Sequence, residues 1–106
     1  MRRAAKIDGN QTELVEAFRT LGCSVLSLAA MGKGVPDLLV SIKGITWLVE
    51  VKMPKGKETP DQVEFATSWQ GCRAIVRDVA GVATVFRIMA AQSVACNALD
   101  MAKFSE

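Results

Sequence analysis

The sequence predicts an α/β domain in which helices flank a mixed β-sheet. Three observations lead to this prediction. Two apolar, β-favouring runs joined by a tight turn, within residues 34–52, indicate a β-hairpin. Helical periodicity precedes the hairpin, and a helix and a further strand candidate follow it. At 106 residues the chain is long enough to bury a real core but too short for two domains.

The predicted order of elements is α-β-β-β-α-β-α, with one more helix as an alternative at the end. After a basic arm at residues 1–9, the elements are a helix at 10–21, a strand at 23–28, a loop at 29–35, the hairpin, a loop at 53–58, a helix at 60–70, a strand at 72–76 and helical segments from 78 to 104. We expect a single domain spanning residues 1–106, with a core at about 10–77 and a C-terminal helical extension at 78–106.

Each helix is predicted from its end signals and its apolar spacing. Asp8 and Asn10 are candidate caps of the first helix, and Gly22 fits its end. Thr59 and Pro60 fit the start of the second helix. The predicted apolar stripes are Leu14, Phe18 and Leu21 in the first helix, Val63, Phe65, Ala66 and Trp69 in the second, and Val79, Val82, Val85, Phe86 and Met89 in the last.

The hairpin is predicted to turn at the Lys43-Gly44 pair, which fixes its register. Ile42 then faces Ile45, and the pairing continues outward until Asp37 faces Glu50. One face of the two strands becomes entirely apolar, as a core face should be: Leu38, Val40, Ile42, Ile45, Trp47, Val49 and Val51. The other face carries its charges at one end.

The opposed acids Asp37 and Glu50 are the strongest chemical signal in the sequence. Directly opposed residues have Cβ atoms about 4.5–5.5 Å apart, so two carboxylates there must protonate, find a counter-charge or bind a cation. Lys52 projects from the same face as Glu50. A hard divalent ion accepts oxygen ligands of this kind. In the preceding loop, Gly32 and Gly34 either admit a ligand close to the backbone or serve a turn with unusual dihedral angles.

Composition narrows the classes of function. The chain has no histidine, which excludes His-ligated zinc and histidine-based nucleophilic mechanisms. Its three cysteines form no CxxC pair and are expected to be core residues in a reducing compartment. The net charge of +2 permits an anionic partner without demanding one. Without a signal peptide or a membrane-spanning segment, the chain is expected to act in the cytoplasm with no membrane partner.

The motif residues resemble a known nuclease pattern. Pro36-Asp37 followed by Glu50-Val51-Lys52 has the form of the PD-(D/E)xK motif. With Gly34 before it and Gln62 in the next helix, the pattern is similar to the virus-type replication-repair nuclease (VRR-NUC) family. The resemblance covers about residues 10–77. It implies a restriction-endonuclease-like α-β-β-β-α-β core, in agreement with the order predicted above.

The resemblance also implies roles for individual residues. Asp37, Glu50 and the Val51 carbonyl would bind Mg²⁺ or Mn²⁺, together with a glutamate of the first helix. Glu13 is the preferred candidate for that glutamate and Glu16 the alternative. Lys52 would orient the nucleophile or stabilise developing charge, and Gln62 would support the lysine or the attacking water.

The activity implied is metal-dependent hydrolysis of DNA phosphodiester bonds. Lys33, Lys55 and Lys57 could contact backbone phosphates. Small stand-alone members of the family tend to be phage-encoded dimers, which would suit an endonuclease acting on branched DNA such as Holliday junctions. The alternatives are a catalytically inactive DNA-binding module and a flap- or exonuclease-type activity.

Overall fold

The computed structural model describes residues 9–104, with the side chains of residues 9–95. The elements follow the predicted order, and the last helical region is one continuous helix. They are α1 (Gln11–Thr20), β1 (Ser24–Ser27), β2 (Leu38–Ile42), β3 (Ile45–Val51), α2 (Pro60–Ser68), β4 (Arg73–Val76) and α3 (Val79–Phe104). Most of the predicted basic arm at residues 1–9, with the candidate cap Asp8, and the side chain of the third cysteine, Cys96, lie outside this described part.

The sheet is mixed, as predicted, with strand order β1-β2-β3-β4. The first three strands are antiparallel, and β4 lies parallel to β3. The β2–β3 register pairs Ile42 with Ile45 and Leu38 with Val49, which confirms the two-residue turn. Lys43 and Gly44 have φ of 48° and 85°, as the type I′ turn of a tight hairpin requires.

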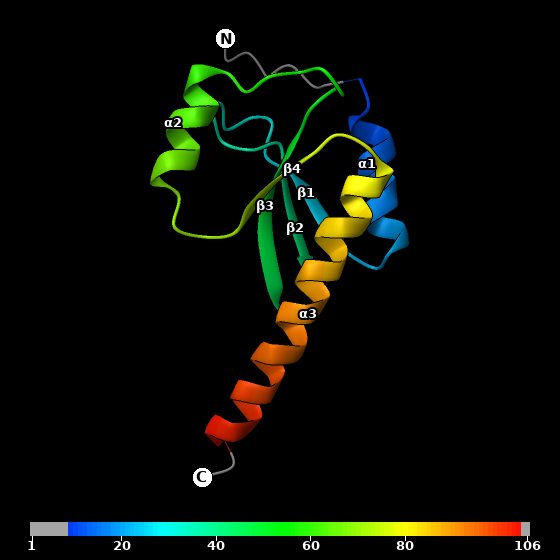
Figure 1. The fold of residues 1–106 in the computed structure, drawn as a ribbon, viewed down its shortest axis with the longest axis vertical. Helices are drawn as coiled ribbons and strands as arrows, with labels where there is room; N and C mark the ends of the chain where they lie inside the picture. The colour runs from blue at the N-terminus through cyan, green and yellow to red at the C-terminus, as the bar shows by residue number, and fades with distance from the viewer. Residues whose placement is uncertain (1–8, 105–106) are drawn as a thin grey trace.

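One face of the sheet and the helices α1 and α3 together form the core (Figure 1). Leu14 and Phe18 of α1 meet Leu38, Val40, Val49 and Val51 of the hairpin and Val82, Val85 and Met89 of α3. Burying a side chain of this size stabilises the fold by about 1.5–3 kcal/mol. The first half of α3 is thus packed into the same core as the sheet.

The tip of the hairpin is anchored to α3 by polar contacts. Trp47 Nε1 donates a hydrogen bond to Gln92 Oε1 at 2.7 Å, and Ser93 Oγ donates to the Lys43 carbonyl at 3.0 Å. Beyond this point α3 continues past the sheet and gives the molecule its long dimension, 53 Å against 28 and 25 Å (Figure 1). None of the described helices combines the length and apolar character needed to cross a bilayer.

Several predicted core positions lie outside the core, among them Val79 at the start of α3. Leu21 is exposed because α1 ends at Thr20 and Gly22 turns the chain with φ of 96°. Cys72 is also exposed, because it lies just outside β4, whereas Cys23 is buried as expected. The apolar residues of α2 are not buried, because this helix lies away from the sheet face that α1 and α3 cover (Figure 1).

The loop before β2 approaches the start of α2 closely at Gly34. This residue has φ of 79°, and a Cβ added to it would lie 2.1 Å from the carbonyl oxygen of Asp61. Gly32 has a similar φ of 64°, but a Cβ there would meet nothing within 4 Å. Both glycines therefore serve turns with unusual dihedral angles. Gly34 also allows a close approach of the backbone, but what it approaches is α2.

The two glycines provide a matched test of this contact. Gly32→Ala is expected to lower the free energy of unfolding by about 1–2 kcal/mol, because an L-residue is strained at positive φ. Gly34→Ala adds an overlap with α2 and is expected to lose about 1–2 kcal/mol more. Urea unfolding of both variants measures the difference, and equal losses would contradict the close packing of Gly34 on α2.

Candidate active site

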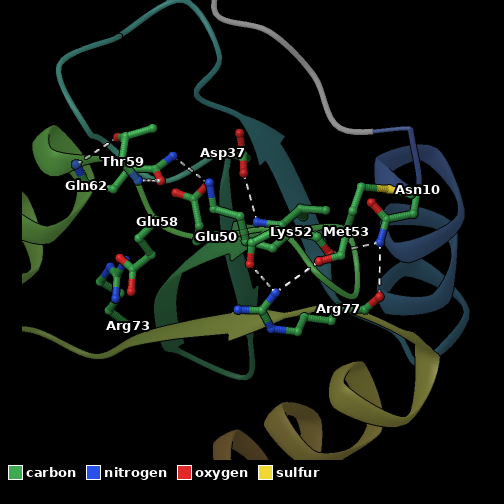
Figure 2. Close-up of polar contacts among 12 residues, drawn as sticks. Asn10, Asp37, Glu50, Lys52, Met53, Glu58, Thr59, Gln62, Arg73 and Arg77 are labelled. Carbon is green, nitrogen blue, oxygen red and sulfur yellow. Dashed lines mark hydrogen bonds and ion pairs between the residues drawn. The ribbon is translucent and has the colours of Figure 1, made fainter.

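The hairpin brings the two predicted acids to one end of the sheet. Leu38 and Val49 are the last paired residues of β2 and β3, so Asp37 and Glu50 follow at the next position. Asp37 Oδ2 accepts a hydrogen bond of 2.8 Å from the backbone N–H of Val51 (Figure 2). This bond fixes the Asp37 carboxylate against the strand that carries Glu50.

Glu50 is buried, with only 1% of its surface exposed. Its Oε2 accepts a hydrogen bond from Gln62 Nε2 at 3.0 Å and lies 3.8 Å from Lys52 Nζ (Figure 2). Its Oε1 is also buried and has no hydrogen-bond partner among the described residues. A buried carboxylate oxygen without a partner is costly unless something binds it.

The surroundings of Glu50 favour its neutral form. Burial raises its pKa, and the adjacent carboxylate of Asp37 raises it further, to about 8. The positive charges of Lys52 and Arg73 only partly offset these effects. Glu50 therefore holds a proton at neutral pH when no cation is near, and a divalent cation would take the place of that proton.

The start of α2 positions Gln62 for its contact with Glu50. Thr59 is the N-cap of the helix, and Pro60 follows it as predicted. The Gln62 N–H donates to Thr59 Oγ1 at 3.2 Å, while Gln62 Oε1 accepts from the Thr59 N–H at 2.8 Å. This capping box occupies the amide oxygen, so the Gln62 NH₂ group points to Glu50. The T-x-x-Q spacing could have revealed the box from the sequence.

Other polar residues hold the chain around the site without lining it. Asn10 Nδ2 donates to the carbonyls of Lys52 at 3.2 Å and Arg77 at 3.0 Å, which ties the start of α1 to the ends of β3 and β4 (Figure 2). Arg77 Nη1 donates to the carbonyls of Met53 at 2.9 Å and Gly56 at 2.6 Å. Asn10 stands at the N-cap position as predicted, but its side chain makes no capping hydrogen bond. The contacts of Asn10 and Arg77 join distant segments, so they could not be predicted from the sequence.

A hollow of about 300 Å³ opens at this end of the sheet. Among the residues that line it are five of those predicted from the sequence: Lys33, Asp37, Glu50, Lys52 and Gln62. We call it the catalytic hollow. The predicted lysines Lys55 and Lys57 are exposed on the loop after β3 and do not line it.

The structure does not bring a glutamate of α1 into the catalytic hollow. Glu13 is exposed, and Glu16 is exposed with an oxygen 3.7 Å from Arg19 Nη1. The buried polar residue of this helix is Gln11, whose Oε1 lacks a hydrogen-bond partner among the described residues. The burial of Gln11 could not be predicted from the sequence, because amphipathic spacing carries no signal for a buried amide.

The residues of the hollow fit a hard divalent cation. Within residues 9–95, no three His, Cys, Asp or Glu side chains cluster as a metal cage. Mg²⁺ is commonly held by one or two carboxylates, with water and substrate phosphate completing its shell. Asp37 and the unpartnered Oε1 of Glu50 supply such a donor set.

Comparison with known proteins identifies the family of the chain. No protein-family model matches the chain, and no curated protein does. A solved structure described as a VRR_NUC domain matches with a TM-score of 0.62 and 30% sequence identity, and the match covers 73% of this chain and 89% of that one. With this identity over nearly all of the solved domain, the chain belongs to the VRR-NUC family.

Proposed function

We propose that this protein is a nuclease that hydrolyses DNA phosphodiester bonds with Mg²⁺ or Mn²⁺ as cofactor. The observation that carries the proposal is the acid pair: Glu50 is buried beside Asp37 with one oxygen unpartnered. Membership of the VRR-NUC family supports the same reading. A domain that only bound DNA would gain nothing from two carboxylates whose proximity disfavours ionisation.

Asp37 and Glu50 would hold the cation, with the Val51 carbonyl as a further ligand. The hydrogen bond from the Val51 N–H keeps Asp37 oriented, and Gln62 keeps Glu50 oriented. When bound, the cation lowers the pKa of a water ligand and neutralises charge on the scissile phosphate.

Lys52 supplies the positive charge of the site. Its side chain is only 10% exposed, and its Nζ lies 3.8 Å from Glu50 Oε2. An ammonium group held in such a dry position can stabilise the charge that develops on the phosphate in the transition state or orient the attacking water. Its link to Glu50 restricts where that ammonium group can move.

We further propose branched DNA as the substrate and a homodimer as the active form. Lys33 is exposed at the hollow and Lys55 and Lys57 are exposed on the loop after β3, where they could contact phosphates on more than one strand. A domain with a cross-section of 28 by 25 Å covers little DNA, whereas a two-fold dimer could place two cuts symmetrically on a Holliday junction. A phage origin, with action in the host cytoplasm, stays a prediction of the family resemblance.

Substitution of the site residues tests the nuclease proposal. Asp37→Asn, Glu50→Gln and Lys52→Ala are each expected to reduce the cleavage rate at least about 100-fold, because each removes a charge used in the transition state. The measurement is cleavage of labelled duplex, flap, splayed-arm, single-stranded and four-way-junction DNA in Mg²⁺ or Mn²⁺. Arg87→Gln, on the exposed side of α3, is the matched control and should cleave like the wild type.

The same panel separates the alternatives. Full activity in EDTA would contradict the metal requirement. DNA binding without cleavage or Mn²⁺ uptake would identify the inactive binding module, and release of single nucleotides would identify an exonuclease. Sedimentation with and without a four-way junction tests the dimer, and a monomer in both conditions would contradict it.

The raised pKa of Glu50 predicts how stability depends on pH. Between its ordinary pKa of 4.5 and about 8, the unfolded chain ionises while folded Glu50 stays protonated. The metal-free wild type is therefore expected to lose stability as the pH rises through this range, by a few kcal/mol at most, whereas Glu50→Gln lacks this loss. Thermal unfolding in EDTA from pH 5 to 9 measures it; parallel curves for the two proteins would contradict the buried neutral acid.

A paired substitution tests the glutamate expected from the first helix. If Glu13 completes the metal shell when DNA is bound, Glu13→Gln should weaken Mn²⁺-dependent cleavage about 10-fold or more, while Glu16→Gln leaves it unchanged. Titration of Mn²⁺ against the cleavage rate distinguishes a lost ligand, which raises the metal concentration required, from a general loss of folding. The reverse pattern would assign the role to Glu16, and two neutral substitutions would remove it from α1.

A further inference from the structure

A second hollow adjoins the catalytic hollow along α2. It measures about 360 Å³ and is lined by Lys33, Asp61, Glu64, Phe65 and Ser68. Lys33 and Asp61 line both hollows, so the two share a wall. If a phosphate of a DNA strand lies at the acid pair, an adjacent sugar, base or phosphate of that strand would therefore reach the second hollow.

An aromatic pair borders this second hollow. Phe65 lines it, and the ring of Trp69 stacks on Phe65 with 5.4 Å between the centroids and 20° between the planes. Trp69 Nε1 donates to the Cys72 carbonyl at 3.4 Å, which helps to fix the pair, although Trp69 is 44% exposed. Because α2 buries no residue, packing in the core does not account for these two aromatic side chains.

The polar residues of the second hollow indicate which part of a nucleotide it suits. Asp61 and Glu64 are exposed carboxylates, which repel a phosphate but accept hydrogen bonds from the amino groups of bases. Lys33 lines both hollows, whereas the buried Lys52 lines only the catalytic hollow and Glu64 lines only the second one. The charges therefore favour a base in the second hollow and a phosphate in the first.

The distance along α2 matches one nucleotide or less. Gln62 contacts Glu50, and Phe65 follows three residues later on the same side of the helix. At a rise of 1.5 Å per residue, this step is about 4.5 Å. A base stacked on Phe65 would thus belong to a nucleotide next to the scissile phosphate.

We propose that the second hollow is a subsite for one unpaired DNA base flanking the cleavage site. The base extends the stack of Trp69 and Phe65, and its exocyclic amino group donates to Asp61 or Glu64. Only an unpaired base can do this, because pairing occupies the amino group and neighbouring bases cover the ring faces in a duplex. The inference rests on the proposed nuclease function and narrows its branched substrate to DNA with an unpaired nucleotide beside the cut, as at a flap or at a branch point where a base pair opens.

Binding by Phe65 variants tests the subsite. The probes are a fully paired duplex and the same duplex carrying a one- to three-nucleotide overhang, followed by fluorescence anisotropy in EDTA and in Ca²⁺. Phe65→Leu should weaken binding of the overhang DNA about 5- to 100-fold, far more than binding of the paired duplex, because it removes the stacking surface. Phe65→Tyr keeps the ring and should bind like the wild type, as should Val63→Ala, an exposed position of α2 outside the hollow.

Fluorescence of a base analogue tests the stacking in the wild-type protein. 2-Aminopurine at the unpaired position should lose fluorescence on binding, because stacking on an aromatic ring quenches it. With dC in place of dT at this position, binding should be about 5-fold tighter, and Glu64→Ala should reduce that preference. An unquenched probe, or Phe65→Leu with equal effects on the two DNAs, would overturn the subsite.

The outcomes distinguish this inference from the nuclease proposal. Wild-type protein that binds overhang DNA through Phe65 but cleaves nothing in Mg²⁺ or Mn²⁺ would overturn the nuclease function and leave the subsite standing. Wild-type protein that cleaves, with overhang binding unaffected by Phe65→Leu, would overturn the subsite alone. Thermal unfolding of each variant confirms that a changed affinity does not arise from loss of the fold.

Discussion

The structure of this site depends on one constraint: two carboxylates are held together across a hairpin in a dry environment. The register of β2 and β3 sets Asp37 beside Glu50, and the Val51 N–H prevents Asp37 from turning away. Burial keeps Glu50 from water, so the pKa of its carboxyl rises to about 8. Lys52 and Gln62 contact the same oxygen of Glu50 and leave the other one without a partner. The free, buried oxygen of Glu50, Oε1, is therefore the atom at which a cation would relieve both the desolvation and the repulsion from Asp37.

Three sets of contacts elsewhere in the chain fix the positions of these two carboxylates. The core of α1, α3 and one sheet face fixes the strands that carry the acids. Asn10 joins the start of α1 to the ends of β3 and β4, beside Lys52. On the other side, Gly34 allows the loop before β2 to lie directly against the start of α2, which delivers Gln62. Residues with no chemical role therefore determine how accurately the chemical groups meet.

The sequence predicts the local parts of this arrangement well and the distant contacts poorly. Period-two alternation and the Lys43-Gly44 turn specify the hairpin register, and with it the meeting of Asp37 and Glu50. The order of elements follows from end signals such as Thr59-Pro60. The contacts of Asn10 and Arg77 join segments more than 20 residues apart, and no periodic pattern encodes them. For the same reason apolar spacing could not show that α2 leaves its apolar residues outside the core, or that Glu13 lies outside the catalytic hollow.

The position of α2 has a consequence for the dynamics of the molecule. This helix has no buried residue, and its described links to the body of the protein are polar or backbone contacts near its first turn, such as that between Gln62 and Glu50. A segment with so little apolar anchorage can open at a fraction of the global unfolding free energy. Its backbone amides should then exchange with deuterium faster than those of α1 or β3. Each such opening would also move Gln62 away from Glu50, so the site would exchange between an open and a closed form. A ligand bound along α2 would shift this equilibrium toward the closed form.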